Sequence, residues 1–446
     1  MFSAFTNIFR VPELKSRVLF VMGILLVYRI GTHIPVPGVN VEALASYFKS
    51  QSNGILGFLN LFSGNALKQA SVFALGVMPY ISMSIILQLL TAVIPALEKL
   101  SKEGEMGRRK ITQYTRIGTL GLCLIQGTGT TYLFKSFGES VIYHWGIGFQ
   151  LMAVLSLTTG TIFIMWLGEQ ITEYGIGNGM SLIICSGIVA SLPGQFLATF
   201  RLVKINEVSL FAVIFFFIFT LLTIAFVVTL QQGARKIPVQ YATRVVGRQV
   251  FKGQSTQLPL KVDYSGVIAV IFASSILIFP TQIAKYIETV LSEKGGEDSW
   301  LYSFMDIITR NFAPGAFIYY FLYSVLIVFF CYFYTAIAFN PTDLSENMKK
   351  YGGFIPGIRP GQPTAEFIDR TLTRITIWGA LAVCAVAVFP DLITRKLHIP
   401  FSFGGTSLLI IVGVALDTMK QIESHLLMRH YDGFMKKGRL KGRSAF

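Results

Sequence analysis

Acidic and histidine side chains, which could bind ions or transfer protons, are nearly absent from the apolar segments of this chain. The carboxylates closest to these segments stand at or near their ends: Glu98, Glu169, Glu173, Asp263, Asp391, Asp417 and Glu423. The five histidines lie at segment edges, in loops or in the tail. An ion-coupled transporter normally keeps a carboxylate or histidine in mid-membrane. This pattern disfavours the alternative that the chain is a secondary transporter of a small solute.

Catalytic and metal-binding motifs are also missing from the sequence. It contains no HExxH, GxSxG, P-loop or dinucleotide-binding fingerprint. The cysteines Cys123, Cys185, Cys331 and Cys384 all fall in apolar segments without CxxC or Cys/His spacing, so free thiols are expected. We predict that the chain is not an enzyme and that it binds no metal and no cofactor.

Uncharged polar residues inside the apolar segments form the remaining chemical pattern. They gather on three segments and include Ser82, Ser84, Gln88, Gln126, Ser274 and Ser275. Such residues commonly join membrane helices through hydrogen bonds of about 0.6–2 kcal/mol each. Gathered on three helices, they also fit a seam that is wetted or opened, because weak bonds part without a large cost. Both readings stay open at this point.

The elements that position these residues are predicted to be membrane helices. The chain has 446 residues, of which 53% are hydrophobic and 14% charged, whereas soluble proteins average about 25% charged residues. Uncharged runs predict ten spans, at about 18–36, 70–94, 117–134, 149–168, 180–198, 209–231, 264–284, 315–339, 374–390 and 403–422. Pro79 is expected inside the second span. A shorter amphipathic piece at 53–67 predicts a half-helix beside a protein-lined or water-filled path.

Lysine and arginine counts predict the orientation of these spans. With the N-terminus inside, the cytoplasmic segments hold 26 of these residues and the opposite loops hold 10. Because lysine and arginine accumulate on the side that is not translocated, both chain ends are predicted to be cytoplasmic. An even number of spans follows from that placement.

Two of the loops predicted to be cytoplasmic are longer than topology requires. Residues 235–261 carry six cations and no acid, and residues 349–374 place Arg359 among glycines and prolines. These loops are either anchors beside anionic lipid or a docking platform for an acidic or phosphate-bearing partner such as ribosomal RNA. Their length and their interspersed apolar residues favour the platform.

Nine sequence segments, spread along almost the whole chain, resemble the SecY/Sec61-alpha family of protein-conducting channels. The segments are YRIGTHIPVPGV (28–39), LNLFSGNAL (59–67), FALGVMPYISMSIILQLL (73–90), GRRKITQYTR (107–116), LGEQITEYGIGNGMSL (167–182), QSTQLPLKV (254–262), IFASSILIFP (271–280), GFIPGIRPGQPTAEFIDR (353–370) and PFSFGGTSLLI (400–410). The resemblance implies an all-α polytopic membrane protein with ten transmembrane helices in two inverted, pseudo-symmetric halves of five, and a short re-entrant plug helix. The halves would be 1–205 and 206–423, with docking loops at 232–263 and 340–374 and a basic tail at 424–446.

The resemblance also implies residues that close the channel. A ring of aliphatic side chains at the pore would comprise Ile81, Ile85, Ile184, Ile188, Ile271 and Ile410. The plug, at about 57–67, would include Gly57, Phe58, Leu59, Asn60, Leu61, Phe62, Ser63, Gly64 and Asn65. Such a ring excludes ions, because removing water from an ion costs more than apolar contacts return.

Two further sets of residues follow from the resemblance. The lateral gate would include Ser82, Ser84, Gln88, Gln126, Ser274, Ser275 and Phe279, and the docking residues would be Arg244, Arg248, Lys252, Lys349, Lys350 and Arg359. The implied function is translocation of unfolded secretory polypeptides and lateral release of membrane-protein segments into lipid. The implied partners are SecE, SecG, the SecA motor ATPase, the ribosome (its RNA and protein), signal sequences and nascent polypeptides, and membrane lipids. The implied location is the bacterial plasma (inner) membrane.

Overall fold

The computed structural model describes residues 11–50, 60, 63–138, 140–241, 244–246, 249–251, 255–293, 300–313, 315–397 and 404–437. The chain divides into two compact units. Unit 1 comprises Met1–Pro193 and Ile410–Phe446, and unit 2 comprises Gly194–Leu409. The first boundary falls inside helix α9 (Gly179–Lys204), at a proline that cannot donate a helical hydrogen bond. The predicted division at 205/206 stays a prediction.

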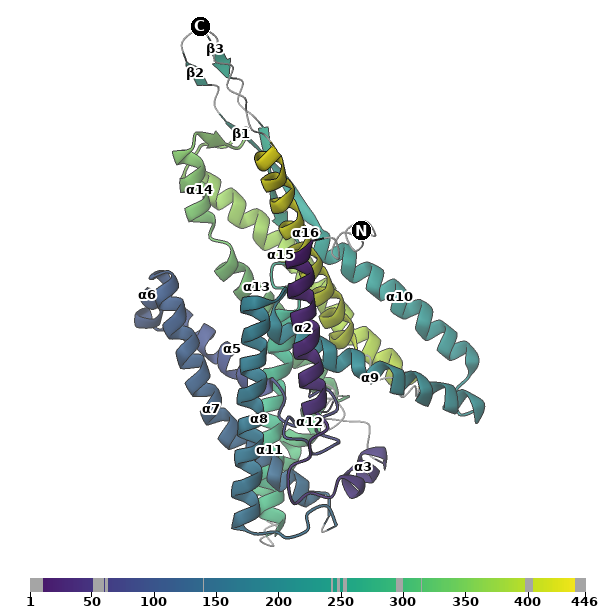
Figure 1. Cartoon of the computed structure of the whole chain (residues 1–446). Helices are drawn as coiled ribbons and strands as arrows, with labels where there is room; N and C mark the ends of the chain where they lie inside the picture. The colour runs from purple at the N-terminus through teal and green to yellow at the C-terminus, as the bar shows by residue number, and fades with distance from the viewer. Residues whose placement is uncertain are drawn as a thin grey trace. The chain divides into compact units, whose positions relative to one another are not determined.

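Unit 1 is built from long helices that pack lengthwise. Its other helices are α2 (Pro12–Gly31), α3 (Val41–Ser50), α5 (Met78–Val93), α6 (Pro95–Lys102), α7 (Glu105–Ser136), α8 (Ile147–Tyr174) and the part of α16 (Gly405–Lys437) from Ile410 onward. Helix α7 lies beside α8, while α5 packs on α7 and α2 packs on α8 (Figure 1). This packing fixes the position of residues 63–77, which precede α5 and are not helical.

Residues 63–77 differ from the sequence prediction, which expected a half-helix over 53–67 and a span beginning at residue 70; residues 53–59, 61 and 62 of that half-helix lie outside the described residues. Residues 63–77 form successive turns, and α5 begins only at Met78. Pro79 therefore occupies the first helical turn, where its missing N–H needs no partner, instead of the helix interior. The backbone at Gly76 is left-handed, with φ 57°. The prediction of helix over 70–77 was wrong because hydropathy does not register these turns.

The turns of residues 63–77 are anchored to their neighbours in unit 1. The N–H of Val36 donates to the carbonyl of Ala70 at 2.8 Å, and that of Val72 donates to the carbonyl of Ile34 at 2.9 Å. Gly160 of α8 lies so close to this stretch that a Cβ there would stand 2.1 Å from the carbonyl oxygen of Val72. A cluster of buried side chains around Leu67, Phe134 and Leu157 completes the packing.

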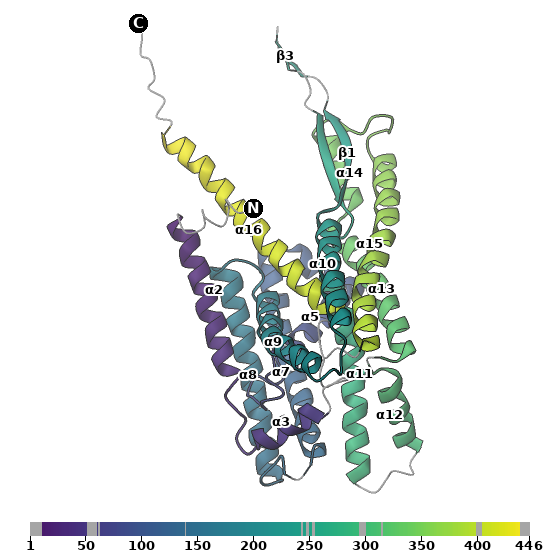
Figure 2. The same cartoon turned by 90° about the vertical axis from the view of Figure 1, so that its right-hand side faces the viewer.

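Unit 2 combines helices with a small sheet. Its helices are α10 (Leu210–Gln232), α11 (Ile268–Glu293), α12 (Trp300–Asn311), α13 (Phe317–Ala338), α14 (Pro341–Lys350) and α15 (Gln362–Lys396). Helix α13 packs between α11 and α15, and α10 also packs on α15. The central strand β1 (Ala234–Tyr241) pairs antiparallel with β4 (Ser255–Lys261) and with β5 (Gly353–Phe354). Strands β2 (Arg244–Val246) and β3 (Gln249–Phe251) form a separate hairpin. Figure 2 shows the long β1 strand continuing beyond the end of α10.

A helix occurs at each of the ten predicted spans, but fewer than ten pass a test of length and apolarity. Among the described residues, seven helices are long and apolar enough to cross a membrane, or eight if the bent pair α5–α6 counts as one span. Helix α2 does not pass because it carries Glu13, Lys15, Arg17 and Arg29. Helix α7 does not pass because glycines, threonines and Gln126 lower its mean hydropathy. The chain is a multi-pass membrane protein, and the count of ten stays a prediction.

Gly160→Ala is expected to destabilise unit 1. The new methyl group would overlap the carbonyl of Val72 and force backbone movement, a cost of about 1–3 kcal/mol. Gly121→Ala is the matched control, because no atom lies within 4 Å of the Cβ position there and alanine is the better helix former. Thermal unfolding in detergent measures the difference. Equal midpoints for the two variants would contradict the close approach of residue 72 to α8.

Candidate functional site

The six isoleucines predicted to form a ring are all buried. Ile81 and Ile85 lie on α5, Ile184 and Ile188 on α9, Ile271 on α11 and Ile410 on α16; each is 7% exposed or less. Both pairs keep the four-residue spacing that stacks side chains on one helix face. Five of the six belong to unit 1 and Ile271 belongs to unit 2. The closed ring itself stays a prediction.

The predicted plug is described only in part. Gly57, Phe58, Leu59, Leu61 and Phe62 lie outside the described residues, whereas Asn60, Ser63, Gly64 and Asn65 lie inside them.

Asn60 holds the described part of the plug together. Its side-chain nitrogen donates to Oδ1 of Asn65 at 2.8 Å, and its Oδ1 accepts from the N–H of Lys68 at 2.9 Å. Its carbonyl accepts from the N–H of Asn65 at 2.8 Å. Residues 63–67 therefore form a turn held by hydrogen bonds to Asn60, where the sequence predicted helix.

The residues predicted to line a lateral gate lie on three helices. Ser82, Ser84 and Gln88 lie on α5, Gln126 lies on α7, and Ser274, Ser275 and Phe279 lie on α11. On α5, Nε2 of Gln88 donates to Oγ of Ser84 at 3.3 Å. Ser274 donates to the carbonyl of Ile271, whereas the buried Oγ of Ser275 has no hydrogen-bond partner among the described residues. The side chain of Phe279 lies outside the described residues.

Two of the three helices that carry these gate residues are in direct contact. Helices α5 and α7 pack closely within unit 1, where Met83 contacts Gly118. Helix α11 belongs to unit 2, so the gate as a whole stays a prediction.

The two basic loops predicted to dock partners form one folded body in unit 2. Strand β1, from the first loop, pairs with β5, from the second, through Gln240 opposite Phe354 and Tyr241 opposite Gly353. Alternate residues of β1 point inward, and Ile237 and Val239 are buried. They join a shared core with Leu260, Met348, Ile355, Ile368 and Leu372. We call this body, residues 234–261 and 341–372, the docking platform.

Arg359 stands on a rigid tip of the docking platform. Its side chain is exposed, while its carbonyl accepts a hydrogen bond from Oγ1 of Thr364 at 2.7 Å. Ser345 Oγ donates to the carbonyl of Gly361 at 2.5 Å. Gly357 and Gly361 have φ values of 84° and 106°, which favour glycine. The loop therefore presents a guanidinium from a backbone that is fixed on both sides.

The other predicted docking residues are described to different degrees. Lys349 and Lys350 end α14 and are exposed. Arg244 lies on β2, with its side chain outside the described residues. Arg248 and Lys252 lie outside the described residues altogether.

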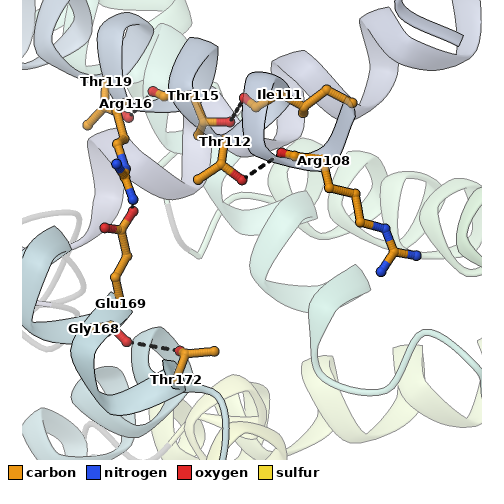
Figure 3. A network of polar contacts seen from close by, with 9 residues as sticks. All are labelled: Arg108, Ile111, Thr112, Thr115, Arg116, Thr119, Gly168, Glu169 and Thr172. Atoms are coloured by element: carbon orange, nitrogen blue, oxygen red, sulfur yellow. Dashed lines mark hydrogen bonds and ion pairs between the residues drawn. The ribbon is translucent and has the colours of Figure 1, made fainter. Parts of the chain in front are cut away.

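A second cationic surface lies on unit 1, at the motif GRRKITQYTR. Figure 3 shows Arg116 of α7 reaching Glu169 of α8, with Nε and Oε1 2.8 Å apart. Nearby threonines donate to carbonyls of their own helix, Thr112 to that of Arg108 and Thr115 to that of Ile111. Three arginines (Arg108, Arg109 and Arg116) and two glutamates (Glu105 and Glu173) line an open cavity of about 720 Å³. The ion pair is largely exposed on the Arg116 side and contributes little stability, about 0–1 kcal/mol.

Asp263 lies in the short segment between strand β4 of the docking platform and helix α11. Its Oδ1 accepts from Oγ of Ser265 at 2.7 Å and from the N–H of Gly266 at 2.9 Å. Burial raises the pKa of this carboxyl above its usual value, against the lowering effect of the two hydrogen bonds. Val262, which follows strand β4, also packs against α15. Gly379 of α15 lies so close to the carbonyl of Val262 that a side chain there would overlap it.

Sequence reasoning missed the sheet that unites the two loops and the partner of Arg29. The apolar residues Ile237, Val239 and Tyr241 at alternate positions of ARKIPVQY were the available signal for β1. Two-residue β5 is too short to give such a signal. No sequence pattern indicates that Arg29 bonds to residue 64.

Known proteins resemble this chain over nearly its whole length. A family model described as SecY matches residues 71–419. Protein translocase subunit SecY of Pseudomonas aeruginosa is 48% identical over 430 residues, which cover 96% of this chain and 95% of that protein.

Two solved structures share the fold of the chain. One is a SecY translocation channel whose plug domain is described as stabilising the closed state and maintaining a membrane seal. Its TM-score is 0.62 at 17% identity, covering 95% of this chain and 94% of that one. Sec61 in the canine ribosome–channel complex has a TM-score of 0.58 at 16% identity, with the same shares covered.

Asp263→Asn is expected to flatten part of the pH dependence of stability. Because burial raises the folded pKa, the wild-type carboxyl contributes stability at low pH that is lost as pH rises through the folded pKa. An asparagine oxygen keeps both hydrogen bonds without the buried charge. The thermal unfolding midpoint of Asp263→Asn, measured relative to that of wild type, should therefore rise between pH 4 and pH 7. Asp263→Ala should lose about 0.5–1.5 kcal/mol per hydrogen bond at either pH. A gain that shrinks with rising pH would contradict the assignment.

Proposed function

This chain belongs to the SecY family of protein translocase subunits, and we propose that it forms the protein-conducting channel of its translocase. Identity of 48% across 96% of the chain to a translocase subunit is the observation that carries this conclusion. The cargo would be unfolded secretory polypeptides, with membrane-protein segments released sideways into lipid. A small-solute transporter is not supported, because the carboxylates of the chain remain near the ends of the apolar segments.

The buried isoleucines support a mechanism for the closed channel. An aliphatic constriction bars ions because they would have to leave their water to cross it. The same side chains offer no fixed hydrogen bonds, so they can yield around a passing polypeptide. Ile184 and Ile188, one turn apart on α9 and each 3% exposed or less, are suited to such a collar. The plug ends in the hydrogen-bonded turn at 63–67, and it would add a second barrier when the channel is idle.

Lateral opening is proposed to occur where the uncharged polar residues gather. Helices α5, α7 and α11 would border the gate. The hydrogen bonds described there lie within single helices, as between Gln88 and Ser84 or from Ser274 to Ile271. A signal sequence, itself an apolar helix, would insert there and contact both lipid and channel.

The docking platform is proposed to bind the partners that drive transport. Its exposed cations suit ribosomal RNA or acidic surfaces of a motor ATPase of the SecA type. The Sec61 channel of the canine complex is bound to a ribosome. SecE and SecG are the proposed membrane partners, with both chain termini and the platform in the cytoplasm of a bacterium and the helices in its inner membrane. The excess of lysine and arginine in the corresponding loops supports this orientation.

Reconstitution with a fluorescent secretory precursor tests the function and the platform together. Vesicles that contain the chain, its membrane partners and the motor ATPase should protect the precursor from protease. Arg359→Glu should reduce this protection at least about tenfold with normal insertion of the chain, because reversed charge repels the partner surface. Arg359→Lys should restore it only in part, since lysine lacks the planar fork of donors.

Arg201→Glu, which reverses an exposed arginine on α9 outside the docking platform, is the control for Arg359→Glu. It should leave transport near wild type. Full transport by Arg359→Glu would remove Arg359 from docking. Absence of protection with the wild-type chain would contradict the channel function itself.

Ile410→Asn is expected to make the closed channel leak. An amide in the constriction lowers the barrier to wetting, so ions pass and precursors with defective signal sequences are accepted. Ile164→Asn is the matched control, because Ile164 on α8 is also 0% exposed and lies outside the predicted ring. That variant should only lose folded protein, since an unpaired buried amide costs about 1–3 kcal/mol. Conductance and protein level in the same membranes separate the two. A normal protein level without ion leak in Ile410→Asn would exclude Ile410 from the pore.

A further inference from the structure

The last turn of α2 binds two successive carbonyls of the turn that ends the predicted plug. Oη of Tyr28 donates to the carbonyl oxygen of Ser63 at 3.3 Å. Nη1 of Arg29 donates to the carbonyl oxygen of Gly64 at 3.0 Å. Tyr28 is 2% exposed and Arg29 is half-buried. Arg29 is the only cation inside the apolar part of α2, so the position of its charge requires an explanation.

The backbone of the turn is shaped to present these carbonyls. Gly64 and Asn65 have φ values of 66° and 69°, in the left-handed region that glycine and asparagine tolerate best. The carbonyl of Ser63 accepts both from Tyr28 and from the N–H of Ala66 at 3.3 Å, whereas the carbonyl of Gly64 turns toward Arg29 of α2. In apolar surroundings an unpartnered carbonyl is strongly unfavourable, so the bonds from α2 stabilise this conformation.

The same turn is pressed against α9 between two of the ring isoleucines. A Cβ on Gly187 would stand 2.9 Å from Cα of Gly64, and a Cβ on Gly64 would stand 2.8 Å from Oη of Tyr28. Glycine at both positions allows this backbone contact. Gly187 lies between Ile184 and Ile188 on α9. The end of the plug is therefore fixed at the helix turn that carries part of the predicted ring.

A second contact holds the chain that follows the turn. The rings of Tyr28 and Phe73 are stacked, with centroids 5.9 Å apart. Gly31, three residues later on α2, leaves room for Phe73, because a Cβ there would stand 2.0 Å from its ring. One turn of α2 thus binds both residues 63–64 and residue 73.

We propose that Tyr28 and Arg29 are positioning residues that latch the end of the plug to α2 and to the Gly187 turn of α9, and so keep the idle channel sealed. The proposal rests on the channel function proposed above. Moving the plug requires breaking both hydrogen bonds and the Gly64–Gly187 contact. The bonds therefore help to set how readily the channel opens. Their donors do not touch the transported polypeptide in this scheme, and they act only through residues 63–65.

Two measurements on the full chain in vesicles with its membrane partners test the latch. Hydrogen exchange of the amides of residues 63–77 reports the latch directly, and ion conductance without precursor reports the seal. Arg29→Met and Tyr28→Phe should each speed this exchange at least about tenfold and raise the leak. Arg17→Met, an exposed cation on the same helix, should change neither.

Gly187→Ala tests the latch from the other helix without touching a charge. Its methyl group should displace Gly64, with faster exchange and leak, whereas Gly194→Ala, with no atom within 4 Å, should behave as wild type. This pair decides the question if Arg29→Met does not fold. Unchanged exchange in these variants would overturn the latch, and faster exchange without leak would overturn its sealing role. Precursor protection by the wild type in the same vesicles tests the channel function separately.

Discussion

Every backbone polar group that enters an apolar layer must find a partner inside the protein, and the stretch 63–77 depends on that constraint. A helix meets it automatically, but this stretch is made of turns. Its amides and carbonyls are bound by α2, by the chain around residues 34–36 and by the side chain of Asn60. Non-helical backbone can therefore persist between spans, and a segment held by separable bonds can also be released.

The docking role proposed for the platform has a different requirement, which is charge presented from an ordered backbone. A long basic loop alone would lose much conformational entropy when it binds a partner. Here the described parts of the two loops share a three-stranded sheet and a buried core, which hold their backbones in place. Glycines at 357 and 361 and the bond from Thr364 fix the tip that carries Arg359. Asp263 then connects the sheet to α11 without a flexible linker.

Small residues decide how closely the parts of unit 1 approach one another. Gly160 admits the carbonyl of Val72, Gly31 admits the ring of Phe73, and Gly187 admits the backbone of Gly64. Each of these contacts brings a turn of residues 63–77 against a helix where a methyl group would separate them. Residues 63–77 are thus positioned by three helices at once, which suits the sealing role proposed for the plug.

The family and the apolar segments could be predicted from sequence alone, because composition and motifs are local properties of the chain. The spacing of Ile81 with Ile85 and of Ile184 with Ile188 was likewise readable, and their burial agrees with it. The turns at 70–77, the pairing of Gln240 with Phe354 and the bond from Arg29 to Gly64 were decided only by tertiary structure. Arg29 and its partner lie 35 residues apart, and the two paired strands more than 100. A hydropathy profile registers what a segment is made of, but not which distant group satisfies its backbone.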